Sequence, residues 1–359
     1  MKGTLLFEDG SIYRGKGFGR SGTAVGEMVF NTSITGYQEI LTDPSYAGQI
    51  VTMTYPLIGN YGISLRESES EGIYARGMVV KSISQHPSHY SSESTLEHMM
   101  QQLGLPGIAE VDTRSITKRI REVGAIKAVI SNEEIAEETL RQLLEGTTLE
   151  EDWMKEVGVS KPKHIPGEGC RVAVLDLGVK ANILEALKIR GCDIMLFPYN
   201  TSFDEMKSYE LDGLLISNGP GNPAEAVTGI ELIRQWLKER PIFGICMGHQ
   251  LLAHAVGGNT FKMKYGHRGG NHGVYDQLKK KAYITSQNHG YVVDAESVIK
   301  KGMMITHTNL NDDSLEGMQH EFLPVFSVQF HPEGSPGPQD TEYLFDQFIE
   351  NMKERKKCL

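Results

Sequence analysis

The chain contains few of the residues that define several common protein classes. Its four cysteines, at positions 170, 192, 246 and 358, form no Cys-x-x-Cys pair, which argues against a disulfide framework or a zinc ribbon. No apolar run reaches the length of a membrane span, and the apolar residues 5–7 are too few for a signal peptide. We therefore expect reduced thiols, a cytoplasmic location and no membrane partner.

Positive charge is also scarce. The 359 residues include 36 Lys and Arg against 46 Asp and Glu, giving a net charge of −10. Proteins that bind nucleic acid without sequence preference carry an excess of basic residues, so no nucleic-acid partner is expected. The length is sufficient for two domains, each with a core of its own.

The pattern of elements changes along the chain. Residues 1–150 combine strand, turn and helix patterns and predict a mixed α+β domain. Residues 151–168 run from charged to Lys-, Pro- and Gly-rich and predict a linker. In residues 169–359 apolar strand patterns alternate with helix patterns. This alternation predicts an α/β domain with a mostly parallel sheet flanked by helices.

Residues 241–252, Pro-Ile-Phe-Gly-Ile-Cys-Met-Gly-His-Gln-Leu-Leu, are the most informative segment. A short apolar run leads into Cys246, and an apolar helix pattern follows at once. This arrangement predicts a nucleophile on a sharp strand-to-helix turn, where Gly244 and Gly248 allow the tight backbone. The helix N-terminus would then favour the thiolate. On this segment alone, a buried and inert cysteine is an equally good interpretation.

A second chemical group follows a later apolar run. Residues 326–330 predict another buried strand, and His331, Pro332 and Glu333 come at its end. A histidine at the carboxyl end of a strand can reach a nucleophile on the neighbouring strand, and a carboxylate two residues later can orient its imidazole. A single histidine is more often structural, but together with the cysteine turn it predicts a Cys-His-Glu triad.

A glycine-rich loop provides the third element of the predicted site. Residues 214–218 predict a strand that ends in Gly219-Pro220-Gly221. Such a loop can direct N–H groups toward an oxyanion, although ordinary turns contain the same residue types. Ligands bind beyond the carboxyl ends of parallel strands, where Gly219, Cys246 and His331 would all lie.

The three motifs, in this order, resemble the class I, triad-type glutamine amidotransferases. They are Ser-Asn-Gly-Pro-Gly at 217–221, Gly-Ile-Cys-Met-Gly-His-Gln at 244–250 and His-Pro-Glu at 331–333. The resemblance covers roughly residues 169–350.

The first half of the chain narrows the resemblance. Residues 26–46 look like the N-terminal domain of carbamoyl-phosphate synthetase small subunits, and residues 108–114 and 266–272 are similar to the same family. The resemblance implies hydrolysis of glutamine to glutamate and ammonia, with Cys246 as nucleophile, His331 as acid and base, and Glu333 as the residue that orients the imidazole.

The resemblance also implies a set of glutamine contacts. These are Ser45, Gly219, Gly221, Met247, Gln250, Asn288, Gly290 and Tyr291. Family members commonly have Leu and Phe where this chain has Met247 and Tyr291, and both exchanges leave a backbone contact possible. Because Ser45 belongs to the N-terminal domain, its role would place the site near the domain boundary.

A partner subunit is a further implication of the resemblance. This chain has no convincing ATP site and no group that would activate bicarbonate. We therefore expect no cofactor in this chain and a larger synthetase subunit that binds ATP and Mg²⁺. That subunit would receive ammonia through an internal tunnel and make carbamoyl phosphate, for arginine or pyrimidine biosynthesis, from bicarbonate and two ATP. The N-terminal domain is the expected docking surface of this heterodimer.

Other interpretations of the sequence remain. His249, His267, His272 and His289 suggest metal ligands, but their spacing matches no standard site, so we expect structural roles and no metal. The chain could also be a free-standing cysteine peptidase or gamma-glutamyl hydrolase, or a binding module with a vestigial triad. The additional N-terminal domain argues against the first alternative, and the presence of Cys, His and Glu argues against the second.

Overall fold

The computed structural model describes residues 1–149 and 153–357. The chain divides into two compact units, Met1–Glu151 and Asp152–Leu359. Cys358 lies outside the described residues. Among the described residues, none of the helices combines the length and apolar character that crossing a bilayer requires.

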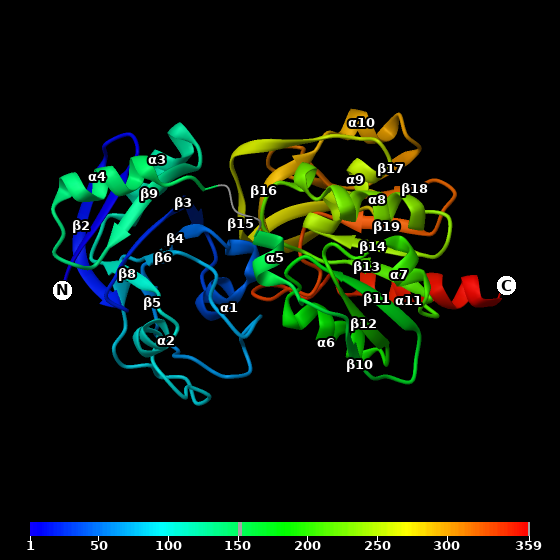
Figure 1. Ribbon diagram of the computed structural model, residues 1–359, viewed down its shortest axis with the longest axis horizontal. Coiled ribbons are helices and arrows are strands. Elements are labelled where there is room, and N and C mark those ends of the chain that lie inside the picture. Colours follow the sequence, from blue (N-terminus) through cyan, green and yellow to red (C-terminus); the bar gives the residue numbers. More distant parts are fainter. Residues whose placement is uncertain (150–152, 358–359) are drawn as a thin grey trace. The chain divides into compact units, whose positions relative to one another are not determined.

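The first unit is built on a closed barrel with the strand order β1-β2-β8-β6-β4-β3-β9 (Figure 1). The strands of this unit are β1 Lys2–Phe7, β2 Ile12–Gly19, β3 Thr23–Asn31, β4 Gln49–Met53, β5 Leu57–Ile58, β6 Gly77–Val79, β7 Ser82–Ile83, β8 Pro106–Ala109 and β9 Ile126–Ser131. Its helices are α1 Tyr37–Thr42, the short 3-10 helix η1 Pro44–Tyr46, α2 Leu96–Gln102, α3 Thr113–Val123 and α4 Glu137–Gly146.

The turn between β1 and β2, the first two strands of the barrel, is stabilised by its own residues. Gly10 adopts a left-handed backbone with φ 88°, which costs a glycine little. The carboxylate of Asp9 accepts a hydrogen bond from the Ser11 N–H at 2.8 Å. The dipeptide Asp9-Gly10 between two short strand patterns predicts a hairpin, and the antiparallel pairing of β1 and β2 confirms it.

The second unit contains a ten-stranded sheet of order β10-β12-β11-β13-β14-β19-β18-β17-β15-β16. Its strands are β10 Lys163–Ile165, β11 Arg171–Asp176, β12 Asp193–Pro198, β13 Gly213–Ile216, β14 Ile242–Ile245, β15 Thr260–Asp276, β16 Lys281–Val293, β17 Met303–Asn309, β18 Leu315–His320 and β19 Val325–Val328. Its helices are α5 Trp153–Val157, α6 Ala181–Ile189, α7 Phe203–Lys207, the short 3-10 helix η2 Pro223–Glu225, α8 Val227–Trp236, α9 Met247–Ala255, α10 Ala295–Ile299 and α11 Tyr343–Lys357.

The expectation of a mostly parallel sheet needs correction. Strands β12, β11, β13, β14 and β19 are mutually parallel neighbours, but β10 and the β18-β17-β15-β16 extension pair antiparallel. Antiparallel neighbours can be joined by short turns, such as residues 277–280 between β15 and β16, and need no crossover helix. The sheet is therefore mixed, with a parallel centre.

Helices cover both faces of this parallel centre (Figure 1). Along β11, Ala173 and Leu175 pack into a core with α8 and α9, whereas Val172 and Val174 pack into a second core with α6 and α11. Because successive side chains of a strand point to opposite faces, a strand buried on both faces has a continuous apolar sequence.

The segment predicted as a linker is largely structured. Helix α5 and strand β10 both lie within residues 151–168, and β10 pairs with β12 at the edge of the sheet. Met154 of α5 is buried in the core of the second unit. From residue 153 onward the segment therefore belongs to the second unit. The linker prediction was wrong here because a charged, Pro- and Gly-rich sequence can still form a short strand at the edge of a sheet.

Candidate functional site

Cys246 lies on a strained turn between β14 and α9. Its backbone has φ 53° and ψ −102°, and its side chain is 2% exposed. A non-glycine residue with positive φ is uncommon and marks stored strain, often at functional sites. A Cβ on Gly248 would lie 2.2 Å from the Ile216 carbonyl oxygen, so this position requires glycine. The backbone therefore holds the cysteine at the N-terminus of α9.

His331 and Glu333 follow strand β19, which neighbours β14. The Nδ1 atom of His331 is 2.7 Å from the Oε1 atom of Glu333, and both side chains are buried. The His331 N–H donates to the Ser286 carbonyl at 2.9 Å, which ties the histidine to β16. Glu333 thus accepts a hydrogen bond from the Nδ1–H group and keeps the proton on that nitrogen. Nε2, on the opposite side of the ring, is then the nitrogen that can exchange a proton.

The environment of His331 favours its charged form. Burial lowers the pKa of the imidazole, but the charge of Glu333 and the hydrogen bonds of Glu333 and Cys246 together raise it more, from 6.5 to about 10. The Cys246 thiol is among the groups that raise this pKa. In the described residues, Nε2 is buried without another hydrogen-bond partner. The ring is therefore a buried proton donor next to the sulfur.

Lys180 is a buried residue of this site that the sequence interpretation missed. Its Nζ atom is 2.7 Å from the Oε1 atom of Glu333, and its side chain also donates to the Ser335 carbonyl. Burial raises the pKa of Glu333, whereas Lys180 and His331 lower it, to about 2. The one available signal was its place just after β11, at the same sheet edge as Cys246 and His331.

Strand β16 passes beside the cysteine. The Cys246 sulfur is 3.6 Å from the Asn288 carbonyl oxygen. The Gln250 side-chain amide donates to the Tyr291 carbonyl at 2.9 Å and to the Gln329 side chain at 3.0 Å. Residues 288–291, whose sequence alone is also compatible with an ordinary turn, are part of strand β16, and Gly290 is among them.

The glycine loop after β13 lies at the strand end next to the cysteine turn, because β13 and β14 are parallel neighbours. A Cβ on Gly219 would lie 2.3 Å from the Leu177 carbonyl oxygen, and Gly221 has φ 98°. Met247 begins α9, and the first N–H groups of a helix have no acceptor within the helix. The loop and the helix start therefore lie at the same carboxyl-terminal edge of the sheet as Cys246.

Ser45 lies in the first unit. It is buried in η1, where its N–H donates to the Asp43 side chain at 2.8 Å. Its contact with glutamine stays a prediction.

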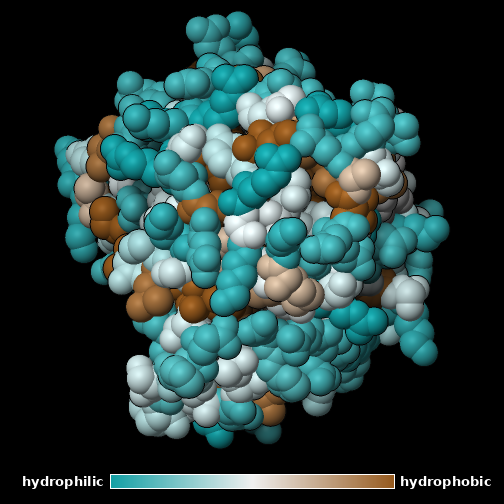
Figure 2. All heavy atoms as spheres, turned by 90° about the vertical axis from the view of Figure 1, so that its left-hand side faces the viewer, coloured by the Kyte–Doolittle hydropathy of each residue, from teal (hydrophilic) through white to brown (hydrophobic). Residues whose placement is uncertain are grey.

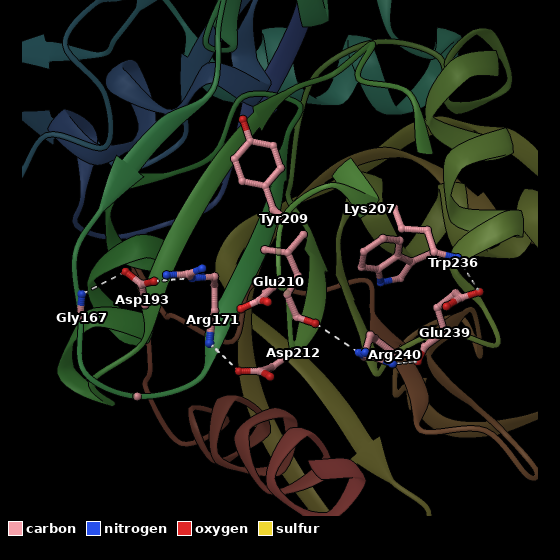
Figure 3. A pocket seen from close by; sticks show the side chains of 12 residues that line it. Gly167, Arg171, Asp193, Lys207, Tyr209, Glu210, Asp212, Trp236, Glu239 and Arg240 are labelled. Atoms are coloured by element: carbon pink, nitrogen blue, oxygen red, sulfur yellow. Dashed lines mark hydrogen bonds and ion pairs between the residues drawn. The ribbon is translucent and has the colours of Figure 1, made fainter. Parts of the chain in front are cut away.

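A cavity of about 700 Å³ lies at the opposite, amino-terminal edge of the parallel strands (Figure 3). Arg171 at the start of β11 pairs with Asp193 at 2.7 Å, and Lys207 pairs with Glu239 at 3.4 Å. The residues that line this cavity include none of the predicted site residues. The cavity is therefore separate from the cysteine site, and most of its charged side chains pair with one another.

Comparison with known proteins covers both units. A family model described as carbamoyl-phosphate synthase small chain, CPSase domain, matches residues 5–130, and one described as glutamine amidotransferase class-I matches residues 173–351. The carbamoyl phosphate synthase small chain of Clostridium acetobutylicum is 54% identical over 349 residues, covering 97% of this chain and 99% of that protein.

The name of a second relative specifies a pathway. The carbamoyl phosphate synthase pyrimidine-specific small chain of Halalkalibacterium halodurans is 46% identical, covering 99% of this chain and 98% of that protein. Among solved structures, a glutamine amidotransferase from Thermotoga maritima matches with 17% identity and a TM-score of 0.39, covering 53% of this chain and 85% of that chain.

Proposed function

This chain belongs to the carbamoyl phosphate synthase small chain family, and from that premise we propose that it hydrolyses glutamine with a Cys246-His331-Glu333 triad and passes the ammonia to a large synthetase subunit. The observation that carries the proposal is that two segments far apart in the sequence, the Cys246 turn and residues 331–333, follow neighbouring parallel strands. Cys246 lies on its strained turn, and the neighbouring strand leads to the 2.7 Å pair of His331 and Glu333.

The first half of the reaction forms a thioester. The Cys246 sulfur attacks the side-chain amide carbon of glutamine, and the carbonyl electrons move to oxygen. The Met247 N–H and the Gly219–Gly221 loop receive this oxyanion, where one such donor typically contributes about 3 kcal/mol. Protonated His331 then donates the Nε2 proton to the departing nitrogen, the C–N bond breaks, and ammonia leaves.

The second half regenerates the enzyme. Neutral His331 takes a proton from water, and the resulting hydroxide attacks the thioester carbon. The C–S bond breaks, glutamate leaves, and the thiolate again faces a protonated imidazole. Glu333 stays ionised throughout and stabilises the imidazolium, a role supported by its buried contacts with His331 and Lys180.

Glutamine itself is held by the predicted contacts, namely Ser45, Gly219, Gly221, Met247, Gln250, Asn288, Gly290 and Tyr291. The contact of Gln250 with the Tyr291 carbonyl supports a shared role for α9 and β16. Such a site makes the reaction specific for a primary amide on an amino acid.

The ammonia has to reach an acceptor without protonation in bulk water. The family's name, small chain of a carbamoyl phosphate synthase, supports a larger partner subunit, and the name of one relative supports a role in pyrimidine synthesis. In this proposal the larger subunit binds ATP and Mg²⁺ and forms carbamoyl phosphate from bicarbonate, for arginine or pyrimidine synthesis. The first unit is the proposed docking surface. On the face drawn in Figure 2, hydrophobic patches are separated by hydrophilic residues. Leu65 and Tyr90 of this unit are 80% and 94% exposed.

The exchange Cys246→Ser in the assembled complex tests the proposal. Glutamine-dependent carbamoyl phosphate synthesis should fall below detection, whereas synthesis from added ammonia should be retained. Equal loss of both activities would contradict this division of labour. A fully active single chain without a larger partner would instead favour a free-standing gamma-glutamyl hydrolase or cysteine peptidase.

A further inference from the structure

A buried group of metal-binding side chains lies beside the cysteine site. His267 of β15 and His289 of β16 are paired across the two strands, and their ring centres are 5.0 Å apart. Glu316 of β18 completes the group, and one ligand atom from each residue lies within 4.8 Å of the others. These side chains are buried, and that of Glu316 is completely enclosed.

Each histidine is oriented by a hydrogen bond on the side of its ring that would face away from an ion. The Nε2 atom of His267 is 2.9 Å from the Oδ2 atom of Asp312, which requires a proton on Nε2. Nδ1 then faces Glu316 at 3.6 Å and the Asn309 amide nitrogen at 3.5 Å. The Nδ1 atom of His289 is 2.7 Å from the Tyr291 carbonyl oxygen and must donate to it. Metal-binding histidines are commonly fixed in this way by a carboxylate or a backbone carbonyl.

The other nitrogen of His289 has an unsuitable neighbour. Its Nε2 atom is 3.0 Å from the Oε1 atom of Gln287. The Gln287 amide orientation is set by Thr285, whose hydroxyl donates to the His272 carbonyl and accepts from Gln287 Nε2. A neutral His289 therefore directs a lone pair at a second acceptor, an arrangement that a cation bound to Nε2 would relieve.

The Glu316 carboxylate, like the His289 ring, has one polar atom that receives no hydrogen bond in the part of the chain that the structure describes. Its Oε1 atom accepts a hydrogen bond from Asn309 at 2.8 Å. Its Oε2 atom is buried and has no hydrogen-bond partner among the described residues. An unpaired carboxylate oxygen in a protein interior carries a large desolvation cost, so it normally has a proton donor or a metal ion nearby.

We propose that His267 Nδ1, His289 Nε2 and the Glu316 carboxylate bind a divalent transition-metal ion of the zinc type. Two imidazoles and one carboxylate are a common ligand set for such ions. Asp312 and the Tyr291 carbonyl orient the two imidazoles. The spacing of the histidines in the sequence could not indicate this site, because its third ligand comes from a different strand.

The ion would position the segment that faces the nucleophile. Asn288, whose carbonyl is 3.6 Å from the Cys246 sulfur, lies between Gln287 and His289. Fixing His289 limits the movement of this carbonyl. The site is independent of the glutaminase proposal, since its ligands include neither Cys246 nor any predicted glutamine contact.

A competing arrangement uses protons instead of an ion. A doubly protonated His267 would pair with both Asp312 and Glu316, and the nearby Arg268 supplies positive charge without a metal. Measurements of metal binding separate the two arrangements.

The test uses the full chain with Cys246→Ser, which removes the catalytic thiol as a metal ligand. Titration calorimetry with Zn²⁺, together with elemental analysis, should give one ion per chain, while Mg²⁺ should not compete. Glu316→Gln and His267→Gln should each weaken Zn²⁺ binding by at least about tenfold. His320→Gln, on the same strand as Glu316 but outside the cluster, should bind as the parent does.

A spectroscopic measurement keeps the proposal testable if a variant fails to fold. Co²⁺ bound to the Cys246→Ser chain should give ligand-field bands without an intense sulfur-to-cobalt charge-transfer band. Absence of stoichiometric binding, a thiolate band, or unchanged affinity in folded Glu316→Gln and His267→Gln would each overturn the proposal. The protonated arrangement would then account for the cluster.

Discussion

At the scale of single residues, Lys180 makes the largest contribution to keeping Glu333 charged, with His331 as the second. Replacing Lys180 by Met removes the group that most strongly lowers the pKa of Glu333, and burial then raises that pKa. We expect glutaminase activity of the variant to be lost at a higher pH on the acid side than in the parent. Breaking a buried ion pair should also cost about 3–5 kcal/mol of unfolding free energy.

The pH profile of glutamine hydrolysis and chemical denaturation measure these effects. Lys188→Met is the matched control, since Lys188 pairs with Glu185 on the exposed face of the adjacent helix. Superimposable acid limbs for the parent and Lys180→Met would show that Lys180 does not control Glu333.

His331 links stability to alkaline pH. Because its pKa is raised from 6.5 to about 10 in the folded chain, its contribution is fully present below pH 6.5 and is lost as the pH rises through about 10. The free energy of unfolding of the parent should therefore decline over this range relative to His331→Asn. Denaturant titrations at several pH values measure the difference, and parallel curves would contradict the charged state proposed for the imidazole.

At the scale of elements, the packing of α9 against β13 depends on one missing side chain. A Cβ on Gly248 would meet the Ile216 carbonyl oxygen at 2.2 Å, and a backbone atom cannot move aside as a flexible side chain can. Gly248→Ala should destabilise the chain by about 1–3 kcal/mol or more and reduce turnover by displacing the cysteine turn. Thermal unfolding and glutaminase assays measure both effects.

Gly146→Ala, at a glycine where a Cβ would meet no atom within 4 Å, is the control for this exchange. It should leave both properties nearly unchanged. A Gly248→Ala chain as active and stable as this control would show that the close contact has no consequence.

The elements also show where sequence patterns give the fold and where they do not. The largely apolar run at 172–177 predicts a strand, and the helix pattern at 180–190, followed by Gly191, predicts a helix. Strand β11 and helix α6 confirm both, because a doubly buried strand and a glycine-terminated helix have strong local signals. β15 gave no such signal, since its sequence is rich in Gly, His and charged residues and it forms by pairing with β16.

The residues of the candidate site also fall into those that a local sequence pattern indicates and those that it does not. Cys246, with its flanking glycines, and His331-Pro-Glu are local patterns, so the sequence could indicate them. Lys180 and Glu316 have no local pattern, because their importance comes from partners far along the chain. A buried lysine or glutamate cannot be distinguished from an exposed one by composition alone.

At the scale of the whole molecule, net charge predicts how the chain behaves toward polyanions. With a net charge of −10, the free chain should not bind a random DNA duplex detectably at concentrations up to about 10 μM, where basic proteins bind through phosphate contacts. Fluorescence anisotropy of a labelled duplex at low salt measures this. Salt-sensitive binding would reveal a basic surface that the overall charge conceals.

The left-handed backbone at Cys246 also limits how inactive forms of this enzyme can be made. A branched Cβ is poorly tolerated at positive φ, so threonine or valine would distort the bend along with removing the thiol. Serine and alanine are the substitutes that keep the bend and discard only the chemistry. A substrate-trapping form for crystallography or ligand screening should therefore be built with one of these two.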